Sequence, residues 1–236
     1  MRVPDDAELL ELWDQGCNRH PIDRALLLAG LARPDLAPGQ VAELPIGAVN
    51  AAVLRFRAAC FGPRIEACLD CERCGEAMEL SLDTAGLLAG AVEDGTIPHV
   101  ERSGFRFRAP DSRDLAALVQ EPDPGGAALA LLERCCVARA RGATADRAGL
   151  LAEVEAAFEA ADPTSSIDLA LTCPVCSHRW TAPLQVAQLV WDELDGHARR
   201  LLGCVHALAR AYGWTESDVL AMSARRRTAY LGLVGA

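Results

Sequence analysis

Apolar and polar positions in residues 1–63 recur with the three- and four-residue steps of amphipathic helices. This spacing predicts three helices, and Pro21 and Pro45 open the second and third, since proline loses no hydrogen bond at a helix start. Gly62-Pro63 ends the third helix. We expect one face of that helix to pack inward, and this face carries Ile46, Val49, Val53, Phe56 and Cys60.

The period changes to two over residues 64–84, where Met78 to Leu82 alternates as a half-buried strand does. The segment therefore predicts a β-hairpin, whose turn holds Cys71 and Cys74. The same pattern returns 102 positions later over residues 165–184, with Cys173 and Cys176 in the turn. The chain is thus expected to contain two hairpins of one design.

Residues 85–164 form an insertion between these hairpins. A small β-hairpin is predicted within it from Pro98 to Arg108, with Ser103-Gly104 at the turn. Apolar periodicity then predicts helices near 112–120, 126–139 and 146–161.

A long apolar stripe begins after the second hairpin and steps by three or four residues from Val186 to Tyr212. It predicts one helix of about seven turns, ended by Gly213, and two short helices after it. The whole pattern predicts an α+β, mostly helical fold with two C-x-x-C β-hairpins as a zinc-ribbon-like module inserted among helices. Its four segments are the N-terminal helices (1–63), the hairpins (64–84 and 165–184), the insertion (85–164) and the C-terminal helices (185–236).

Four of the ten cysteines have the spacing of a structural zinc site. Zinc prefers four tetrahedral soft ligands, and each C-x-x-C turn offers two thiolates. Two other interpretations remain open: buried cysteines without a metal, or a redox protein with two disulfides. We expect Zn²⁺ in a structural role, bound by Cys71, Cys74, Cys173 and Cys176.

Cys68 makes the first turn ambiguous, because Cys68 and Cys71 also have the C-x-x-C spacing and only one such pair fits a four-ligand site. The duplication favours Cys71 and Cys74, since Cys68 aligns with Ala170 in the second hairpin. His178 is a further possible ligand, although four thiolates leave it no vacancy. The sequence leaves open whether Cys68 or His178 can replace a ligand.

Charge and composition narrow the possible functions. The net charge of −10 repels phosphate backbones and anionic membranes. All 23 basic residues are arginine, so enzymes that depend on a lysine general base or a lysine Schiff base are excluded. No familiar catalytic motif occurs, so we expect neither an enzyme nor a small-molecule substrate. Without a signal peptide or an apolar span, the protein is expected in the cytoplasm, without membrane contact.

Several segments resemble the baseplate hub assembly chaperones of contractile-tailed phages and of phage-tail-like contractile injection systems. They are LLELWDQGCNRHPIDRALLLAG, RFRAACFGPRIEACLDCERCGEAMEL, RFRAPDSRDL, LALTCPVCSHRW and YGWTESDVLAMSARRRTAYLGLV. The resemblance implies a non-enzymatic assembly chaperone or minor structural component, with baseplate hub or spike proteins as its partners. The duplicated zinc hairpins depart from the smallest phage members.

The alternative function is a zinc-ribbon nucleic-acid-binding or regulatory adaptor protein. Nucleic-acid binding would require basic and aromatic residues around the hairpins, whereas acidic residues crowd the first one. Nucleic acid is therefore an unlikely partner on charge grounds, and we expect the long helix with the terminal helices to contribute to a protein-binding surface.

Overall fold

The computed structural model describes residues 2–92 and 96–234. The first 63 residues contain four helices where the sequence predicts three, because one short turn of helix lies between the second and third. The first helix begins with a reciprocal capping box between Asp5 and Glu8. The four helices are α1 (Asp6–Gly16), α2 (Pro21–Ala32), α3 (Pro38–Val41) and α4 (Ile46–Phe61).

Helix α4 buries the face that the sequence predicts. Val53 and Phe56 are fully buried and Val49 is nearly so. The helix ends where Gly62 adopts a φ of 91°, a conformation open to glycine at little cost.

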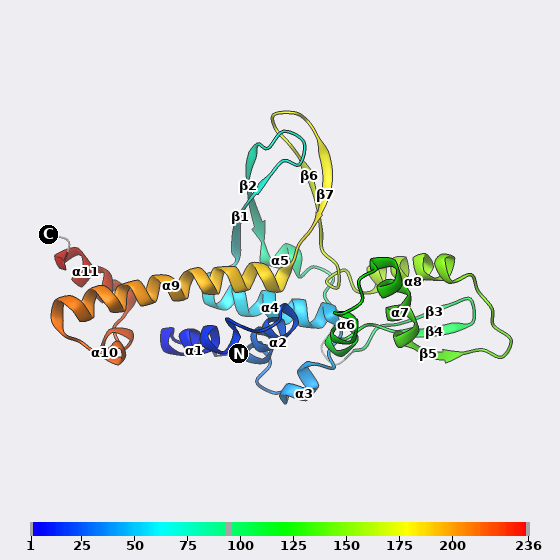
Figure 1. Ribbon diagram of the computed structural model, residues 1–236, viewed down its shortest axis with the longest axis horizontal. Coiled ribbons are helices and arrows are strands. Elements are labelled where there is room, and N and C mark those ends of the chain that lie inside the picture. Colours follow the sequence, from blue (N-terminus) through cyan, green and yellow to red (C-terminus); the bar gives the residue numbers. More distant parts are fainter. Residues whose placement is uncertain (1, 93–95, 235–236) are drawn as a thin grey trace.

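Two separate two-stranded antiparallel hairpins project from the helical layer and lie beside each other (Figure 1). Both hairpins are predicted from the sequence, and the structure confirms them. Their strands are β1 (Arg64–Asp70) with β2 (Ala77–Asp83), and β6 (Asp168–Thr172) with β7 (Arg179–Pro183).

The insertion contains a three-stranded sheet in the order β3-β4-β5, which differs from the prediction. The predicted turn at Ser103-Gly104 is confirmed, with both residues at positive φ. The predicted helix 126–139 is wrong at its end, because residues 136–139 form a strand that pairs with the free edge of β4. The insertion comprises α5 (Thr84–Leu87), β3 (His99–Arg102), β4 (Phe105–Arg108), α6 (Ser112–Leu118), α7 (Pro124–Cys135), β5 (Cys136–Arg139) and α8 (Arg147–Ala161).

The predicted long helix is α9 (Val186–Tyr212), and Gly213 ends it in the left-handed conformation. Two short helices follow, α10 (Glu216–Leu220) and α11 (Ala224–Val234). Figure 1 shows that the C-terminal half of α9 extends past α4 and carries α10 and α11 at its end.

The largest core joins α1, α2, α4 and α9 with the bases of both hairpins. Ile65 and Leu82 from the first hairpin, and Ile167 and Leu184 from the second, pack against it. A second core fills the insertion, a third lies between α1 and α9, and a fourth lies between the hairpins. The α+β, largely helical fold is thus confirmed, whereas the division into four segments stays a prediction.

Candidate metal centre

Each hairpin tip is shaped by the same pair of backbone hydrogen bonds. In the first tip, Cys71 N donates to Glu76 O (2.8 Å) and Gly75 N donates to Cys71 O (2.8 Å). These bonds fold the turn around the Cys71 side chain, and Gly75 permits it with a φ of 71°. The second tip repeats the bonds from Cys173 N to His178 O (2.9 Å) and from Ser177 N to Cys173 O (3.0 Å), with Ser177 at a φ of 56°.

The two tips bring four sulfur atoms together, and all of them lie within 4.8 Å of one another. Cys71 Sγ is 3.7 Å from Cys176 Sγ, and Cys74 Sγ is 3.6 Å from Cys173 Sγ. Tetrahedral bonds of about 2.3 Å to one zinc would separate the sulfurs by about 3.8 Å. A disulfide would require about 2.05 Å. The donor set therefore fits a metal ion.

The cluster sits on the inner faces of the hairpins. Cys71 and Cys173 are 2% and 1% exposed, and they form a small core with Met78. Leu69 and Trp180 pack against this core from β1 and β7. Side chains from both hairpins thus cover Cys71 and Cys173, whereas Cys74 is exposed and Cys176 is partly buried.

Strand alternation explains why Cys68 stays outside the cluster. Side chains of β1 alternate between its two faces, and Ile65 and Leu69 point to the inner one. Cys71 follows Leu69 by two positions and so lies on the same inner face. Cys68 is exposed on the opposite face, across from Glu79. His178 also lies outside the group, and its ring stacks on Trp180 with centroids 5.5 Å apart.

Two of the four thiols have pKa values shifted in opposite directions. The backbone N–H of Cys176 donates to Cys173 Sγ (3.5 Å), and this lowers the pKa of the Cys173 thiol to about 7. At Cys74 a backbone hydrogen bond from Glu76 favours the thiolate, but burial and the other thiols outweigh it and raise the pKa to about 12. The Cys173 thiol therefore loses its proton readily, and its negative charge disfavours ionisation of a second thiol unless a bound cation neutralises both charges.

A metal ion held by all four sulfurs has only protein ligands. Such a shell leaves no coordination position for water or substrate. The geometry therefore suits an ion that cross-links two hairpins, and it does not suit metal-assisted hydrolysis.

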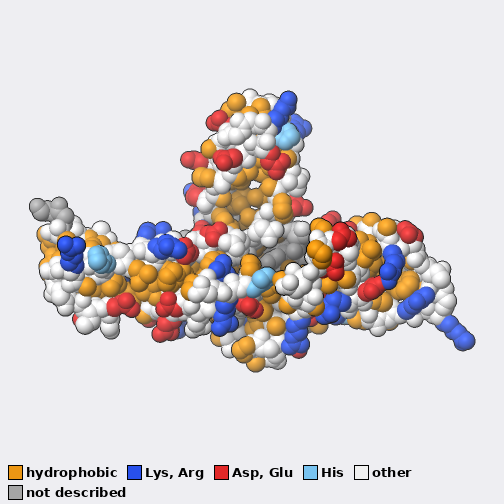
Figure 2. Space-filling view, viewed as in Figure 1, with side chains coloured by type: hydrophobic (Ala, Val, Ile, Leu, Met, Phe, Trp, Pro, Cys, Tyr) orange, Lys and Arg blue, Asp and Glu red, His pale blue; other side chains and the backbone are white. Residues whose placement is uncertain are grey.

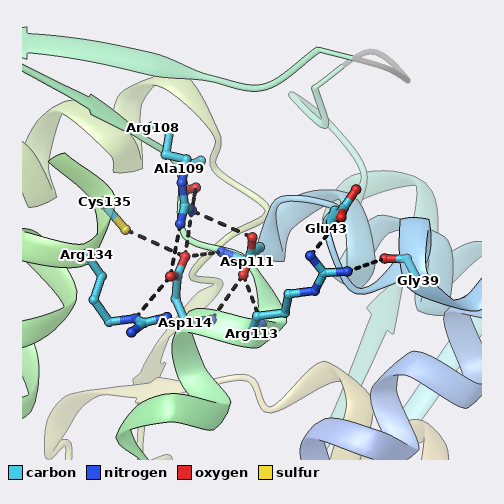
Figure 3. Close-up of polar contacts among 9 residues, drawn as sticks. All are labelled: Gly39, Glu43, Arg108, Ala109, Asp111, Arg113, Asp114, Arg134 and Cys135. Carbon is cyan, nitrogen blue, oxygen red and sulfur yellow. Dashed lines mark hydrogen bonds and ion pairs between the residues drawn. The ribbon is translucent and has the colours of Figure 1, made fainter. Parts of the chain in front are cut away.

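A second polar cluster, which the sequence analysis missed, surrounds Asp114 (Figure 3). This carboxylate is 1% exposed and accepts two hydrogen bonds from Arg108 (2.6 and 2.9 Å) and one from Arg134 (3.2 Å). It also accepts from the backbone N–H of Asp111, as part of the capping box of α6. The signal in the sequence was Asp111-x-x-Asp114 at a helix start.

This cluster ties the insertion to the N-terminal helices. Arg113 pairs with Glu43 (2.7 Å) and donates to Gly39 O (3.1 Å), as Figure 3 shows. Burial opposes ionisation of Asp114, yet the arginine contacts outweigh it and hold the pKa below its ordinary value. A carboxylate with so many donors stays ionised and is not suited to proton transfer.

Two further cysteines lack the chemistry of a nucleophile. Burial, followed by the charge of Asp114, raises the pKa of Cys135 to about 12. Burial alone raises that of Cys60 to about 11. Both side chains stay protonated thiols near neutral pH, and they serve packing.

Comparisons of the chain with protein families, curated proteins and solved structures found no match. Among the described helices, none combines the length and apolar character needed to cross a bilayer.

Proposed function

We propose that this protein is a non-enzymatic assembly factor, stapled by one structural zinc, that acts by binding other proteins. Its proposed partners are the hub or spike proteins of a contractile phage tail or contractile injection system. The observation that carries the proposal is the group of four sulfurs within 4.8 Å of one another, contributed in pairs by two hairpins.

Zinc is the ion that this donor set suits best. Four thiolates in tetrahedral arrangement select zinc or iron among the common metals of proteins. The two tips repeat one backbone turn, and a zinc ion held between them would give the layout of a zinc ribbon. Zinc needs no redox partner, and a closed four-sulfur shell is its usual structural site.

A non-catalytic role accords with the described side chains. The carboxylate of Asp114 is saturated by arginines, and Cys60 and Cys135 are held as thiols. The chain also has no lysine to serve as base or Schiff-base former.

The choice of partner rests on the resemblance in sequence to the baseplate hub assembly chaperones. An acidic, largely helical protein is consistent with a chaperone that holds another subunit before assembly.

The metal assignment is tested by elemental analysis of the purified protein, with about one zinc expected per chain. Cys71→Ser and Cys173→Ser should lose most of this zinc, because three thiolates leave the shell open. Cys68→Ser is the matched control and should keep it, since Cys68 is exposed on the other face. Equal loss in the control, or wild-type protein without zinc, would refute the ligand set.

The partner assignment is tested by co-expression with hub and spike proteins and capture through a tag on this chain. We expect one of them to be retained, while a sheath protein from the same system is not. Failure to retain either the hub or the spike would remove the baseplate proposal and leave the zinc site intact.

A further inference from the structure

The last part of the chain carries the opposite charge to the rest. We name residues 199–234, the end of α9 with α10 and α11, the C-terminal arm. It contains six arginines and two acidic residues, a net charge of +4, whereas the chain as a whole carries −10. The remaining residues therefore carry −14. An acidic partner would be repelled by the body and attracted by the arm.

The arm is held in place by one of its arginines. Arg227 is 4% exposed, pairs with Asp6 on α1, and donates to Met222 O (2.9 Å) at the end of α10. The three consecutive arginines therefore differ in environment, because Arg227 is buried whereas Arg225 and Arg226 are exposed. This internal anchor holds α11 against α1 and leaves Arg225 and Arg226 at the surface.

Four arginines of the arm lack an acidic partner. Each is exposed, and none forms an ion pair within residues 2–92 and 96–234. A guanidinium without a carboxylate retains its capacity for bidentate bonding to one. These arginines are Arg200, Arg210, Arg225 and Arg226.

The same arm contains an aromatic cluster. The rings of Tyr212 and Trp214 stack with centroids 4.5 Å apart, and Tyr230 meets Trp214 edge-on at 4.8 Å. Both tyrosines of the chain belong to this cluster. Tyr212 is nevertheless 40% exposed, so the cluster also forms part of the surface.

One face of α11 carries a charged, an aromatic and an aliphatic side chain. Arg226, Tyr230 and Leu233 follow at steps of four and three, and so share a helix face. Leu233 is 68% exposed, the most among the large apolar side chains of the described residues. Figure 2 shows basic and hydrophobic side chains together over this end of the molecule. Arginine, tyrosine and tryptophan are the residues that most often dominate binding energy at protein interfaces.

We infer that the C-terminal arm is a docking surface for an acidic segment of a partner protein that also carries apolar side chains. The partner's carboxylates meet Arg225 and Arg226, and its apolar side chains cover Leu233 and Tyr230. Nucleic acid fits less well, because the −14 charge of the body lies next to the arm and opposes a long phosphate chain. This inference rests on the proposed function only in taking the ligand to be a protein.

The test uses the full chain and a short fluorescent peptide of alternating glutamate and leucine or phenylalanine. Its fluorescence anisotropy should report binding at low salt that weakens as salt is added. Arg225→Glu with Arg226→Glu should weaken binding by about tenfold or more, since two charge-assisted contacts are lost. Leu233→Ser should weaken it by severalfold, and circular dichroism should stay unchanged for both.

The matched control reverses two exposed arginines outside the arm, Arg19→Glu with Arg141→Glu, and should change affinity by less than about threefold. Equal weakening in both double variants, no peptide binding, or tighter binding of a single-stranded oligonucleotide would each overturn the inference. Capture of the hub or spike protein separates the two proposals. If Arg225→Glu with Arg226→Glu captures it at full strength, the arm is excluded while the proposed function stands.

Discussion

At the scale of single residues, Asp6 links three helices. Its carboxylate accepts from Arg227 on α11 and from His197 Nε2 on α9 (3.1 Å). Burial opposes its ionisation, but these two donors outweigh burial and hold the pKa of Asp6 below its ordinary value of 3.8. Ionisation of Asp6 therefore stabilises the folded state relative to the unfolded state.

This linkage predicts a specific acid sensitivity. The contribution of Asp6 to the free energy of unfolding is fully present above pH 3.8 and is lost as the pH falls through the lower folded pKa. Asp6→Asn should cost about 2 kcal/mol at neutral pH, because Arg227 loses its anion. Urea titrations between neutral and strongly acidic pH should show the gap to wild type narrowing below pH 3.8. A constant gap would show that Asp6 acts through packing alone.

At the scale of the secondary-structure elements, one pair of equivalent positions in the two hairpin tips carries different residues in the same backbone conformation. Gly75 and Ser177 both have positive φ (71° and 56°), which costs a residue with a side chain about 1–2 kcal/mol. Gly75→Ala meets no atom within 4 Å, so it should destabilise the hairpin by about 1 kcal/mol through the backbone alone. Ser177→Gly should leave the free energy of unfolding unchanged or raise it by up to about 1 kcal/mol, because the relief of backbone strain is offset by the greater entropy of glycine in the unfolded state.

Gly203 gives the matched control for this prediction. It lies inside α9 at ordinary helical φ, with no atom within 4 Å of an added Cβ. Gly203→Ala should therefore stabilise the protein by about 0.5–1 kcal/mol. Thermal unfolding of zinc-loaded protein measures all three, and a loss at Gly203 equal to that at Gly75 would exclude the backbone explanation.

Local periodicity was sufficient to predict most of these elements. The change from a period of three or four to a period of two marks both hairpins, and the stripe from Val186 predicts α9 to its final residue. Strand β5 could not be predicted, because its four residues continue a helical pattern and become a strand only through pairing with β4.

The cysteine cluster was predictable from the sequence, whereas the ion pairs of the polar clusters were not. Duplication of the C-x-x-C turn selects Cys71 over Cys68, and strand parity in the structure agrees with that choice. The contacts of Asp114 with Arg134 and of Asp6 with Arg227 join distant segments. A single sequence carries no periodic signal for pairs of this kind.

At the scale of the whole molecule, the sulfur cluster and the main core are separate. The small core at the hairpin tips contains Cys71, Met78 and Cys173, none of which belongs to the core of α1, α2, α4 and α9. Within residues 2–92 and 96–234, the hairpins pack on the main core at their bases, through Ile65 and Ile167. Two-stranded hairpins alone are at best marginally stable in water.

Removal of the metal should therefore unfold the protein locally. Structural zinc contributes on the order of 10 kcal/mol, and this energy acts where the hairpin tips have little other apolar contact. After treatment with a strong chelator, hydrogen exchange should become fast in residues 67–80 and 169–182 and stay slow in the middle of α4 and α9. The helical circular dichroism should be retained, because these helices bury their own core. Loss of helical signal together with the hairpins would instead show that the metal stabilises the whole fold as one cooperative unit.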